Sequence, residues 1–184
     1  MGHPVLHQVA ENVDDPTDVE IAVLVEDMLE TLDDAGGIGL AAPQVHVSKR
    51  VIIFFVPQGR ESEEDMPTDL TIMVNPIIEP LSDETNLDWE ACLSVPGLMG
   101  AVERFSHIKY SWTSLEGKLE EREAKGFHAR AVQHECDHLD GKLYPMRMTD
   151  FTTFGFVEET NRNIALMRKG HGREIDDHVM EEAQ

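Results

Sequence analysis

The segment 131-AVQHECDHLDG-141 places His134 and His138 four residues apart, with Glu135 directly after the first histidine. Residues four apart on an α-helix lie about 40° apart around its axis, one turn above the other, so both imidazoles can reach one metal ion. Glu135 then lies where its carboxylate can take a proton from a water molecule at that metal. Two histidines at this spacing also occur as ordinary core or surface residues. The segment predicts a metal-binding helix, and a purely structural histidine pair is the alternative.

A catalytic metal of this kind needs a third protein ligand and one open position for water. Glu158 lies on a predicted helix downstream, as in metallopeptidases that use a distant glutamate. Cys92 lies in the apolar segment 90-EACLSVPG-97, and a thiolate binds divalent transition metals well, although a single cysteine in such a segment is often only packed. Cys136 is a weak rival, because it lies about 200° around the helix from His134. Spacing alone leaves Glu158 and Cys92 both open.

A second chemical group lies in the segment 37-GIGLAAPQ-44. Its glycines alone fit an ordinary flexible link after a helix. Gln44 is more informative, because a buried primary amide needs hydrogen-bond partners. Facing a metal, its NH₂ group can donate to an oxygen that becomes negatively charged during a reaction. We therefore expect Gln44 to stabilise an oxyanion.

The elements that position these groups follow from the pattern of apolar residues. Apolar residues recur at helical spacing over 21–32, after a capping-box pattern at 17–20 and before the glycines at 36–37, which predicts a helix. The β-branched and aromatic block 51–56 predicts a buried strand. The charged stretch 59–70 predicts an exposed loop.

Two further regions predict β-structure before the metal-binding helix. Residues 71–78 read as a strand in which Pro76 favours an edge position or a bend, because proline cannot donate to a strand ladder. Residues 81–88 read as a polar connection, and alternation over 105–124 predicts a hairpin. Strands followed by a helix set against them favour an α+β fold, with antiparallel sheets packed around the central metal-binding helix.

Length and composition limit the remaining choices. The 184 residues suit one domain, so we expect residues 1–169 to form it, with a helix near 158–169 and an acidic, mobile tail at 170–184. The sequence lacks both a basic leader and the roughly 18 consecutive apolar residues of a membrane span, so we expect a cytoplasmic protein without a membrane partner. The net charge of −21 disfavours binding to nucleic acid.

The motifs GIGLAAPQ (37–44), EACLSVPG (90–97) and QHECDHLDG (133–141), in this order, resemble the three signature motifs of the peptide deformylases. The resemblance extends from residues 2–6 to 143–148. It implies a cytoplasmic hydrolase of protein biosynthesis that removes the formyl group from the N-terminal formyl-methionine of new polypeptides and releases formate. Some family members carry a basic C-terminal helix linked to ribosome contact, and the acidic tail makes that route doubtful here.

Carried over residue by residue, the resemblance implies that Cys92, His134 and His138 hold one divalent metal ion. Ferrous iron is the usual native ion of the family, and zinc, nickel or cobalt can replace it. The resemblance therefore favours Cys92 over Glu158 as the third ligand, and it gives Glu135 the role of general base and then general acid.

The same resemblance assigns the remaining contacts to substrate. Gln44 and the backbone N–H of Leu93 would stabilise the oxyanion, and Gly39 would bind substrate through its backbone. The methionine side chain is expected in an apolar pocket. We expect the following residues to line it, the last one at its mouth: Ile38, Phe127, Ala131 and Arg130.

Supporting residues and competing functions complete the predictions. We expect Glu90 to orient a metal-binding histidine, and an Arg104–Asp137 pair to brace strand against helix. Ala91 stands where the family usually has glycine, which would strain the backbone if that position required a positive φ. The alternatives are a metallopeptidase that uses Glu158 and a non-enzymatic acidic metal-binding domain.

Overall fold

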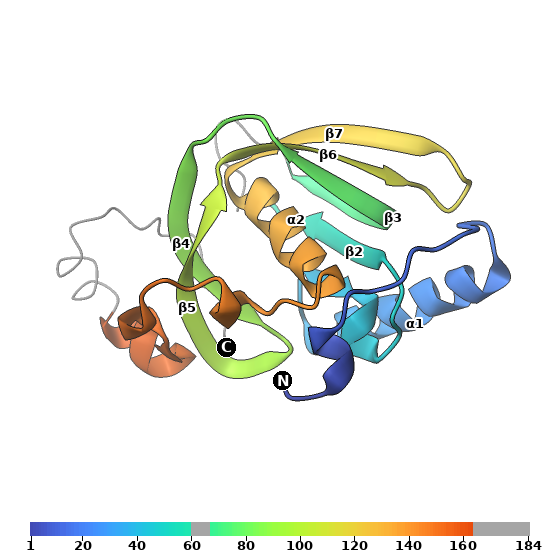
Figure 1. Cartoon of the computed structure of the whole chain (residues 1–184). Helices are drawn as coiled ribbons and strands as arrows, with labels where there is room; N and C mark the ends of the chain where they lie inside the picture. Colours follow the sequence, from blue (N-terminus) through green and yellow to red (C-terminus); the bar gives the residue numbers. More distant parts are fainter. Residues whose placement is uncertain (60–66, 164–184) are drawn as a thin grey trace.

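The computed structural model of the chain describes residues 1–59 and 67–163 (Figure 1). The elements, in chain order, are η1 (Pro4–His7), α1 (Val19–Ala35), β1 (Gly39–Ala41), η2 (Ala42–Val45), β2 (Val51–Val56), β3 (Thr68–Pro80), β4 (Thr85–Cys92), β5 (Val95–Phe105), β6 (His107–Thr113), β7 (Leu119–Lys125), α2 (Gly126–Leu139), η3 (Tyr144–Met146), η4 (Phe151–Thr153) and β8 (Gly155–Phe156). Residues 157–163 are also helical. The predicted tail 170–184 and the end of the predicted helix beyond residue 163 lie outside the described residues.

Two antiparallel sheets enclose α2 (Figure 1). The five-stranded sheet has the order β1-β2-β3-β6-β7, and the three-stranded sheet has the order β4-β5-β8. One hydrophobic cluster joins α2 to one face of the five-stranded sheet, and a second cluster joins α1 to its other face. α2 also contacts β5 of the smaller sheet. The predicted α+β class with antiparallel sheets is confirmed.

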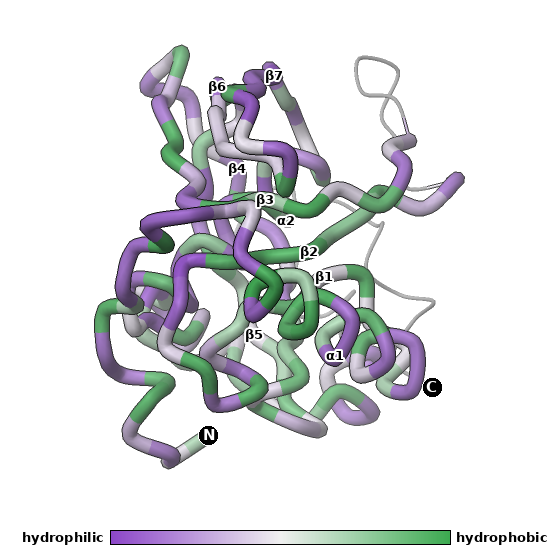
Figure 2. The backbone as a smooth tube through the Cα atoms, turned by 90° about the vertical axis from the view of Figure 1, so that its right-hand side faces the viewer, coloured by the Kyte–Doolittle hydropathy of each residue, from purple (hydrophilic) through white to green (hydrophobic). Residues whose placement is uncertain are grey.

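β2 shows why an uninterrupted apolar block forms a strand here. Ile52 and Phe54 pack in the cluster with α2, whereas Val51 and Ile53 pack in the cluster with α1. A strand buried on both faces needs apolar residues at every position rather than at alternate ones. Figure 2 shows β2 as a hydrophobic stretch and α1 as a mixture of hydrophobic and hydrophilic residues, as a helix with one buried face requires.

The predicted first helix is confirmed, with a different cap. Asp18, not Thr17, is the N-cap, and its side chain accepts a hydrogen bond from the backbone N–H of Glu20. Thr17 instead donates to Asp15, so its hydroxyl is not used by the helix. The helix ends where Gly36 adopts the left-handed conformation at φ 65°. Glycine enters that region without a steric penalty, which explains the clean stop.

Two predicted connections are partly strands. β3 begins at Thr68, inside the predicted loop 59–70, and β4 begins at Thr85, inside the predicted connection 81–88. Most residues of these strand ends are polar and at least partly exposed, although Asp88 is buried, and polarity alone does not separate such an end from a loop. Pro76 lies at a register shift in β3, as expected of a bend, but β3 is an interior strand rather than an edge. The predicted hairpin is formed by β6 and β7.

α2 begins at Gly126, and the chain leaves it through Asp140 and Gly141, where φ is 69°. A Cβ atom at Gly141 would come within 2.7 Å of the backbone of His7, so this turn requires glycine for close packing as well as for conformation. Nearly the whole length of α2 is buried, including the charged residues Arg130, Glu135 and Asp137. A buried helix with this many polar groups must pair them internally.

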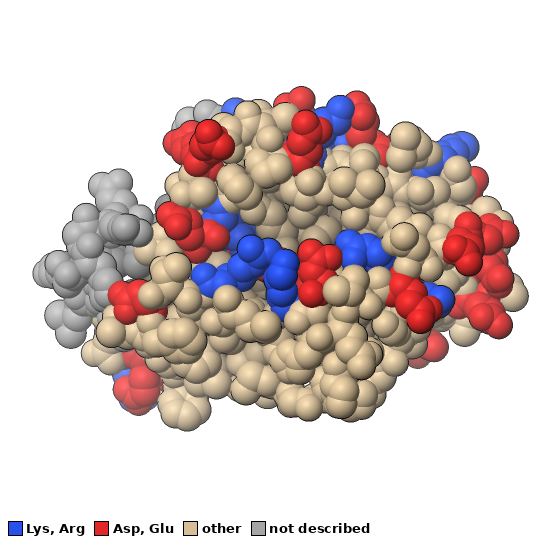
Figure 3. All heavy atoms as spheres, viewed as in Figure 1, with Lys and Arg blue, Asp and Glu red and all other residues tan. Residues whose placement is uncertain are grey.

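Charge is distributed unevenly on the face drawn in Figure 3. Acidic side chains lie mainly along its upper part and at its two sides, and Lys and Arg gather near its centre next to acidic groups. Basic residues of the described chain are largely held in ion pairs, such as Arg50 with Asp140 and Lys49 with Glu11. None of the helices in the described part of the chain combines the length and apolar composition that crossing a membrane requires.

Candidate metal centre and substrate cavity

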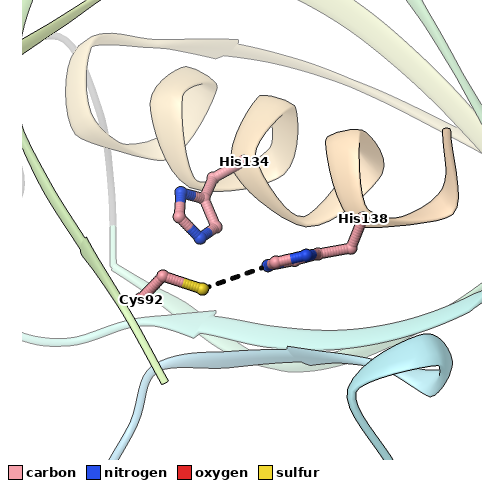
Figure 4. Close-up of side chains that lie close together, drawn as sticks. All are labelled: Cys92, His134 and His138. Carbon is pink, nitrogen blue, oxygen red and sulfur yellow. Dashed lines mark hydrogen bonds between the residues drawn. The ribbon is translucent and has the colours of Figure 1, made fainter. Parts of the chain in front are cut away.

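The side chains of Cys92, His134 and His138 converge (Figure 4). Their candidate ligand atoms all lie within 4.8 Å of one another, and Cys92 Sγ is 3.3 Å from His138 Nε2. Cys92 ends β4, and the two histidines lie one turn apart on α2. The geometry therefore brings together one sulfur and two imidazoles, a donor set that suits a divalent transition metal.

Glu90 orients the first histidine. Its Oε2 lies 2.8 Å from His134 Nδ1, which leaves the other ring nitrogen, Nε2, for a metal. Metal-binding histidines usually donate their second N–H to a carboxylate in this way. Burial alone would lower the pKa of His134, but its hydrogen bonds to Cys92 and Glu90 outweigh burial and raise that pKa well above its ordinary value. Glu90, the predicted partner of a metal-binding histidine, is therefore the residue that contacts His134.

A buried ion network supports Glu90. Arg104 donates through Nε to Glu90 Oε1 at 2.8 Å and through Nη2 to Oε2 at 2.9 Å, and its Nη1 donates to Asp137 at 2.6 Å. Arg147 donates to the same Asp137 at 3.0 Å. Burial would raise the pKa of Glu90, but Arg104 and then His134 hold it well below its usual range. The expected Arg104–Asp137 pair is present and joins β5 to α2.

His138 is kept neutral by its surroundings. Burial, followed by the nearby His134, lowers the pKa of His138 to about 3. A neutral imidazole has a free lone pair, which is the form that binds a metal ion. Its Nδ1 is buried without a hydrogen-bond partner among the described residues. The ring is therefore held by packing and by its approach to Cys92.

Glu135 lies beside the cluster with an unsatisfied carboxylate oxygen. Among the described residues, its Oε2 is buried without a hydrogen-bond partner. Burial raises the pKa of Glu135 to about 7, and a divalent cation nearby would lower it again. A carboxylate that titrates near neutral pH is suited to accept and return a proton.

Gly39 in β1 packs directly against Glu135. A Cβ atom at position 39 would lie 2.8 Å from Glu135 Cδ and closer still to Oε1. Glycine at this position lets the strand backbone approach the carboxylate. Because β1 is an edge strand of its sheet, one side of its backbone faces away from β2.

Gln44 is held with its amide nitrogen towards the cluster. Its Oε1 accepts a hydrogen bond from the backbone N–H of Ala41 at 2.8 Å, and its Nε2 lies 3.8 Å from Cys92 Sγ. The oxygen is thus occupied, and the NH₂ group points to the metal ligands. Ser94 was not among the site residues predicted from the sequence. Its Oγ accepts a hydrogen bond from Gln44 Nε2 at 3.2 Å, and its backbone N–H donates to Cys92 Sγ at 3.4 Å. In the sequence, the signal for Ser94 was its position two residues after the candidate ligand Cys92.

A cavity of about 780 Å³ opens beside the cluster. Its lining includes the remaining predicted site residues: Ile38, Gly39, Cys92, Leu93, Phe127, Arg130, Ala131, His134 and Glu135. Leu93 is exposed at the turn between β4 and β5, and Ala131 is buried on α2. The structure thus brings the predicted pocket residues and two of the three candidate metal ligands, Cys92 and His134, to one cavity.

Four predictions can be compared with the geometry of the described residues. Arg130 lines the cavity but does not lie at an exposed mouth, because it is only 6% exposed and its guanidinium is bonded to Glu90. Glu158 lies on the exposed rim of the cavity and is not part of the ligand cluster found among the described residues. Ala91 does not have a positive φ, so replacing the family's usual glycine with alanine causes no backbone strain of that kind. Cys136 packs in the core cluster, away from the metal ligands.

Comparisons with known proteins agree with this geometry. The model of the polypeptide deformylase family matches residues 1–153. Peptide deformylase 1 of Bordetella pertussis is 50% identical over 158 residues, which cover 86% of this chain and 90% of that protein. Peptide deformylase 2 of Ralstonia nicotianae is 48% identical over 158 residues, with 86% and 89% covered.

Solved structures extend the comparison to the fold. A class I type b peptide deformylase from Acinetobacter baumannii, bound to Met-ala-ser, has a TM-score of 0.73 at 38% identity and covers 80% of this chain and 94% of its own. The enzyme from Ehrlichia chaffeensis has a TM-score of 0.75 at 29% identity, with 94% and 96% covered. On the family match and the identity to these relatives, the chain belongs to the polypeptide deformylases, a family of enzymes.

Proposed function

We propose that this chain is a metal-dependent hydrolase that removes the formyl group from the N-terminal formyl-methionine of new polypeptides and releases formate. The observation that carries the proposal is the convergence of Cys92, His134 and His138 beside Glu135 at a cavity, in a chain of this family. The relative from Acinetobacter baumannii was solved with a Met-ala-ser peptide bound, which supports a peptide substrate.

The donor set fits the implied metal. Sulfur and imidazole nitrogen bind Fe(II), Zn, Ni and Co alike, so we propose one divalent ion per chain, with Fe(II) as the native one. Glu90 already occupies Nδ1 of His134, so Nε2 is the nitrogen left to bind. When bound, such an ion lowers the pKa of water from 15.7 towards about 7 and polarises a carbonyl group.

Glu135 moves the proton in the proposed reaction. Its carboxylate accepts a proton from the attacking water as the water oxygen bonds to the formyl carbon. The same carboxyl group then returns the proton to the amide nitrogen as the C–N bond breaks. The products are formate and a polypeptide with a free N-terminal amine. Burial raises the pKa of Glu135 to about 7 without a cation, and a bound ion would lower it again, so the carboxylate would be ionised when it accepts the proton.

Gln44 and Leu93 stabilise the charge that develops on the formyl oxygen. The Nε2 group of Gln44 points to the cluster because its Oε1 is bonded to Ala41, so the donor is oriented before substrate arrives. Leu93 follows Cys92 at the turn and would offer its backbone N–H. Donors fixed in this way reduce the reorganisation needed in the transition state.

The cavity would hold the methionine side chain and the first peptide groups. Ile38, Phe127 and Ala131 supply apolar surface at the cavity wall. Gly39 would bind the substrate backbone from the free side of β1. We further propose that residues 1–169 form one catalytic domain that acts in the cytoplasm, where new polypeptides emerge. Docking to the ribosome through the acidic tail is not part of the proposal.

The test is formate release from formyl-Met-Ala-Ser by protein purified without oxygen, with hydrolysis of unformylated Met-Ala-Ser followed in parallel. We expect formate from the first peptide and no cleavage of the second. Glu135→Gln is the matched control, because it should retain the metal and lose turnover. Cleavage of the unformylated peptide would favour a metallopeptidase, and metal binding without either reaction would favour a non-enzymatic domain.

A further inference from the structure

Arg130 is a buried arginine whose role extends beyond lining the cavity. It lies on α2 one turn before His134, and it is 6% exposed. Its Nη1 donates to Glu90 Oε1 and to the carbonyl of Val102, both at 2.8 Å, and its Nη2 donates to the carbonyl of Asn86 at 2.8 Å. Nη1 also lies 3.5 Å from the carbonyl of Asp88, so one side chain links α2 to both β4 and β5 through four acceptors.

The carboxylate of Glu90 is fully occupied only when Arg130 is present. A carboxylate offers about four lone-pair positions, two on each oxygen. Oε1 accepts from Arg104 Nε and Arg130 Nη1, and Oε2 accepts from Arg104 Nη2 and His134 Nδ1. Arg130 thus fills the fourth position. Without it, Oε1 has one open position, and only Arg104 and His134 hold the carboxylate in its orientation.

Glu90 also connects the two sources of metal ligands. It lies two residues before Cys92 on β4, and its carboxylate contacts His134 on α2. Arg104 holds Glu90 from β5, so it does not fix β4 against α2 by that bond. Arg130 does, because it belongs to the same helix as His134 and bonds to β4 at both Asn86 and Glu90.

We propose that Arg130 is a positioning residue for the metal centre, acting through Glu90 on His134 and on the spacing between α2 and Cys92. The inference rests on the proposed function only for its turnover measurement. Loss of a partner that orients a metal ligand typically lowers metal affinity or activity by 10- to 100-fold. We expect a loss of that size for Arg130→Met, which keeps a long side chain but no donors.

Lysine should restore little of the loss. Its ammonium is a compact point donor, whereas the four acceptors around Arg130 are spread over two strands and match a planar guanidinium. We therefore expect Arg130→Lys to fold, with a Co(II) affinity between that of Arg130→Met and that of the natural protein. Arg50→Met is the matched control, because Arg50 also contacts α2, at the carbonyl of Leu139 and at Asp140, without touching Glu90.

The experiment measures Co(II) affinity by competition with a chelator, and the Co(II) absorption spectrum, for Arg130→Met, Arg130→Lys and Arg50→Met. The expected result is a 10- to 100-fold weaker affinity with an altered spectrum for Arg130→Met, and a change within about twofold for Arg50→Met. For formyl-Met-Ala-Ser, kcat should fall while KM changes little. If KM rises more than kcat falls and the Co(II) affinity is normal, Arg130 only lines the pocket, and the proposal is overturned.

A double-mutant cycle with Glu90→Gln separates this role from general stabilisation. If Arg130 acts through Glu90, Arg130→Met should weaken Co(II) binding far less in the Glu90→Gln background than in the natural protein. Additive losses would overturn the proposal. If Arg130→Met does not fold, the Co(II) affinity of Arg130→Lys tests the proposal instead. A Co(II) affinity equal to that of the natural protein in Arg130→Lys would then refute the inference. If the natural protein releases no formate, the proposed function fails while the Co(II) measurements still test Arg130.

Discussion

Substitution of Gly39 by alanine tests how closely β1 must approach Glu135. The added Cβ would lie 2.8 Å from Glu135 Cδ and 3.0 Å from Cγ. Carbon atoms in contact prefer about 3.5–4.0 Å, so the carboxylate must retreat by roughly 1 Å. A misplacement of about 1 Å can lower a rate by about 100-fold, which corresponds to about 2.7 kcal/mol in the barrier. The backbone itself is not strained, because Gly39 does not have a positive φ.

The assay for Gly39→Ala is kcat for formyl-Met-Ala-Ser, with bound metal and thermal unfolding measured on the same preparation. We expect kcat to fall about 100-fold with the metal retained, and a loss of about 1–3 kcal/mol in stability from overpacking. Gly37→Ala is the control, since its Cβ would come closest to the flexible ends of Leu93 and Leu32, at 3.1 and 3.2 Å, and would lie at an ordinary contact distance of 3.7 Å from the Gly39 carbonyl oxygen. Its kcat should stay within about threefold. Unchanged kcat in Gly39→Ala would refute the reasoning.

Three further outcomes follow from the site. Gln44→Ala should raise the barrier by about 2.7–4 kcal/mol, seen as a lower kcat, while the free energy of unfolding in urea falls by only about 1–2 kcal/mol for the lost hydrogen bonds to Ala41 and Ser94; equal losses in both would argue against an oxyanion role. Arg104→Met removes one arginine partner from each of the buried carboxylates Glu90 and Asp137 and should lower the free energy of unfolding in urea by about 3–5 kcal/mol; a loss below about 1 kcal/mol would contradict the network described. Cys92→Ala should abolish tight metal binding while Glu158→Gln leaves it intact, as elemental analysis would show; the reverse pattern would restore Glu158 as the ligand.

Much of the fold was predictable from local patterns. The helix over 21–32 and the hairpin within 105–124 show clear periodicities, and both are present. The strand ends at 68–70 and 85–88 were read as connections, because most of their side chains are polar. What makes them strands is pairing with residues distant in sequence, such as Asn86 with Arg104, and single-sequence polarity carries no signal of that pairing.

The site was predictable where spacing on one helix or a family motif constrained it. His134 and His138 follow from helical geometry, whereas the choice of Cys92 over Glu158 needed the resemblance, because the two residues differ in tertiary position and not in any local pattern. Arg130 shows the limit of such reasoning. A charged residue near a cavity suggests an exposed mouth, but its acceptors on Asn86 and Val102 belong to strands that only the folded chain brings to it.

The ligands come from chain segments that fold into different layers. Cys92 and His138 lie 46 positions apart, one at the end of a strand of the small sheet and the other on the buried helix. A metal ion bound by both residues would form a reversible cross-link that closes a long loop, much as a disulfide does. Its release would loosen the smaller sheet from the helix, so heat resistance and metal content would rise and fall together.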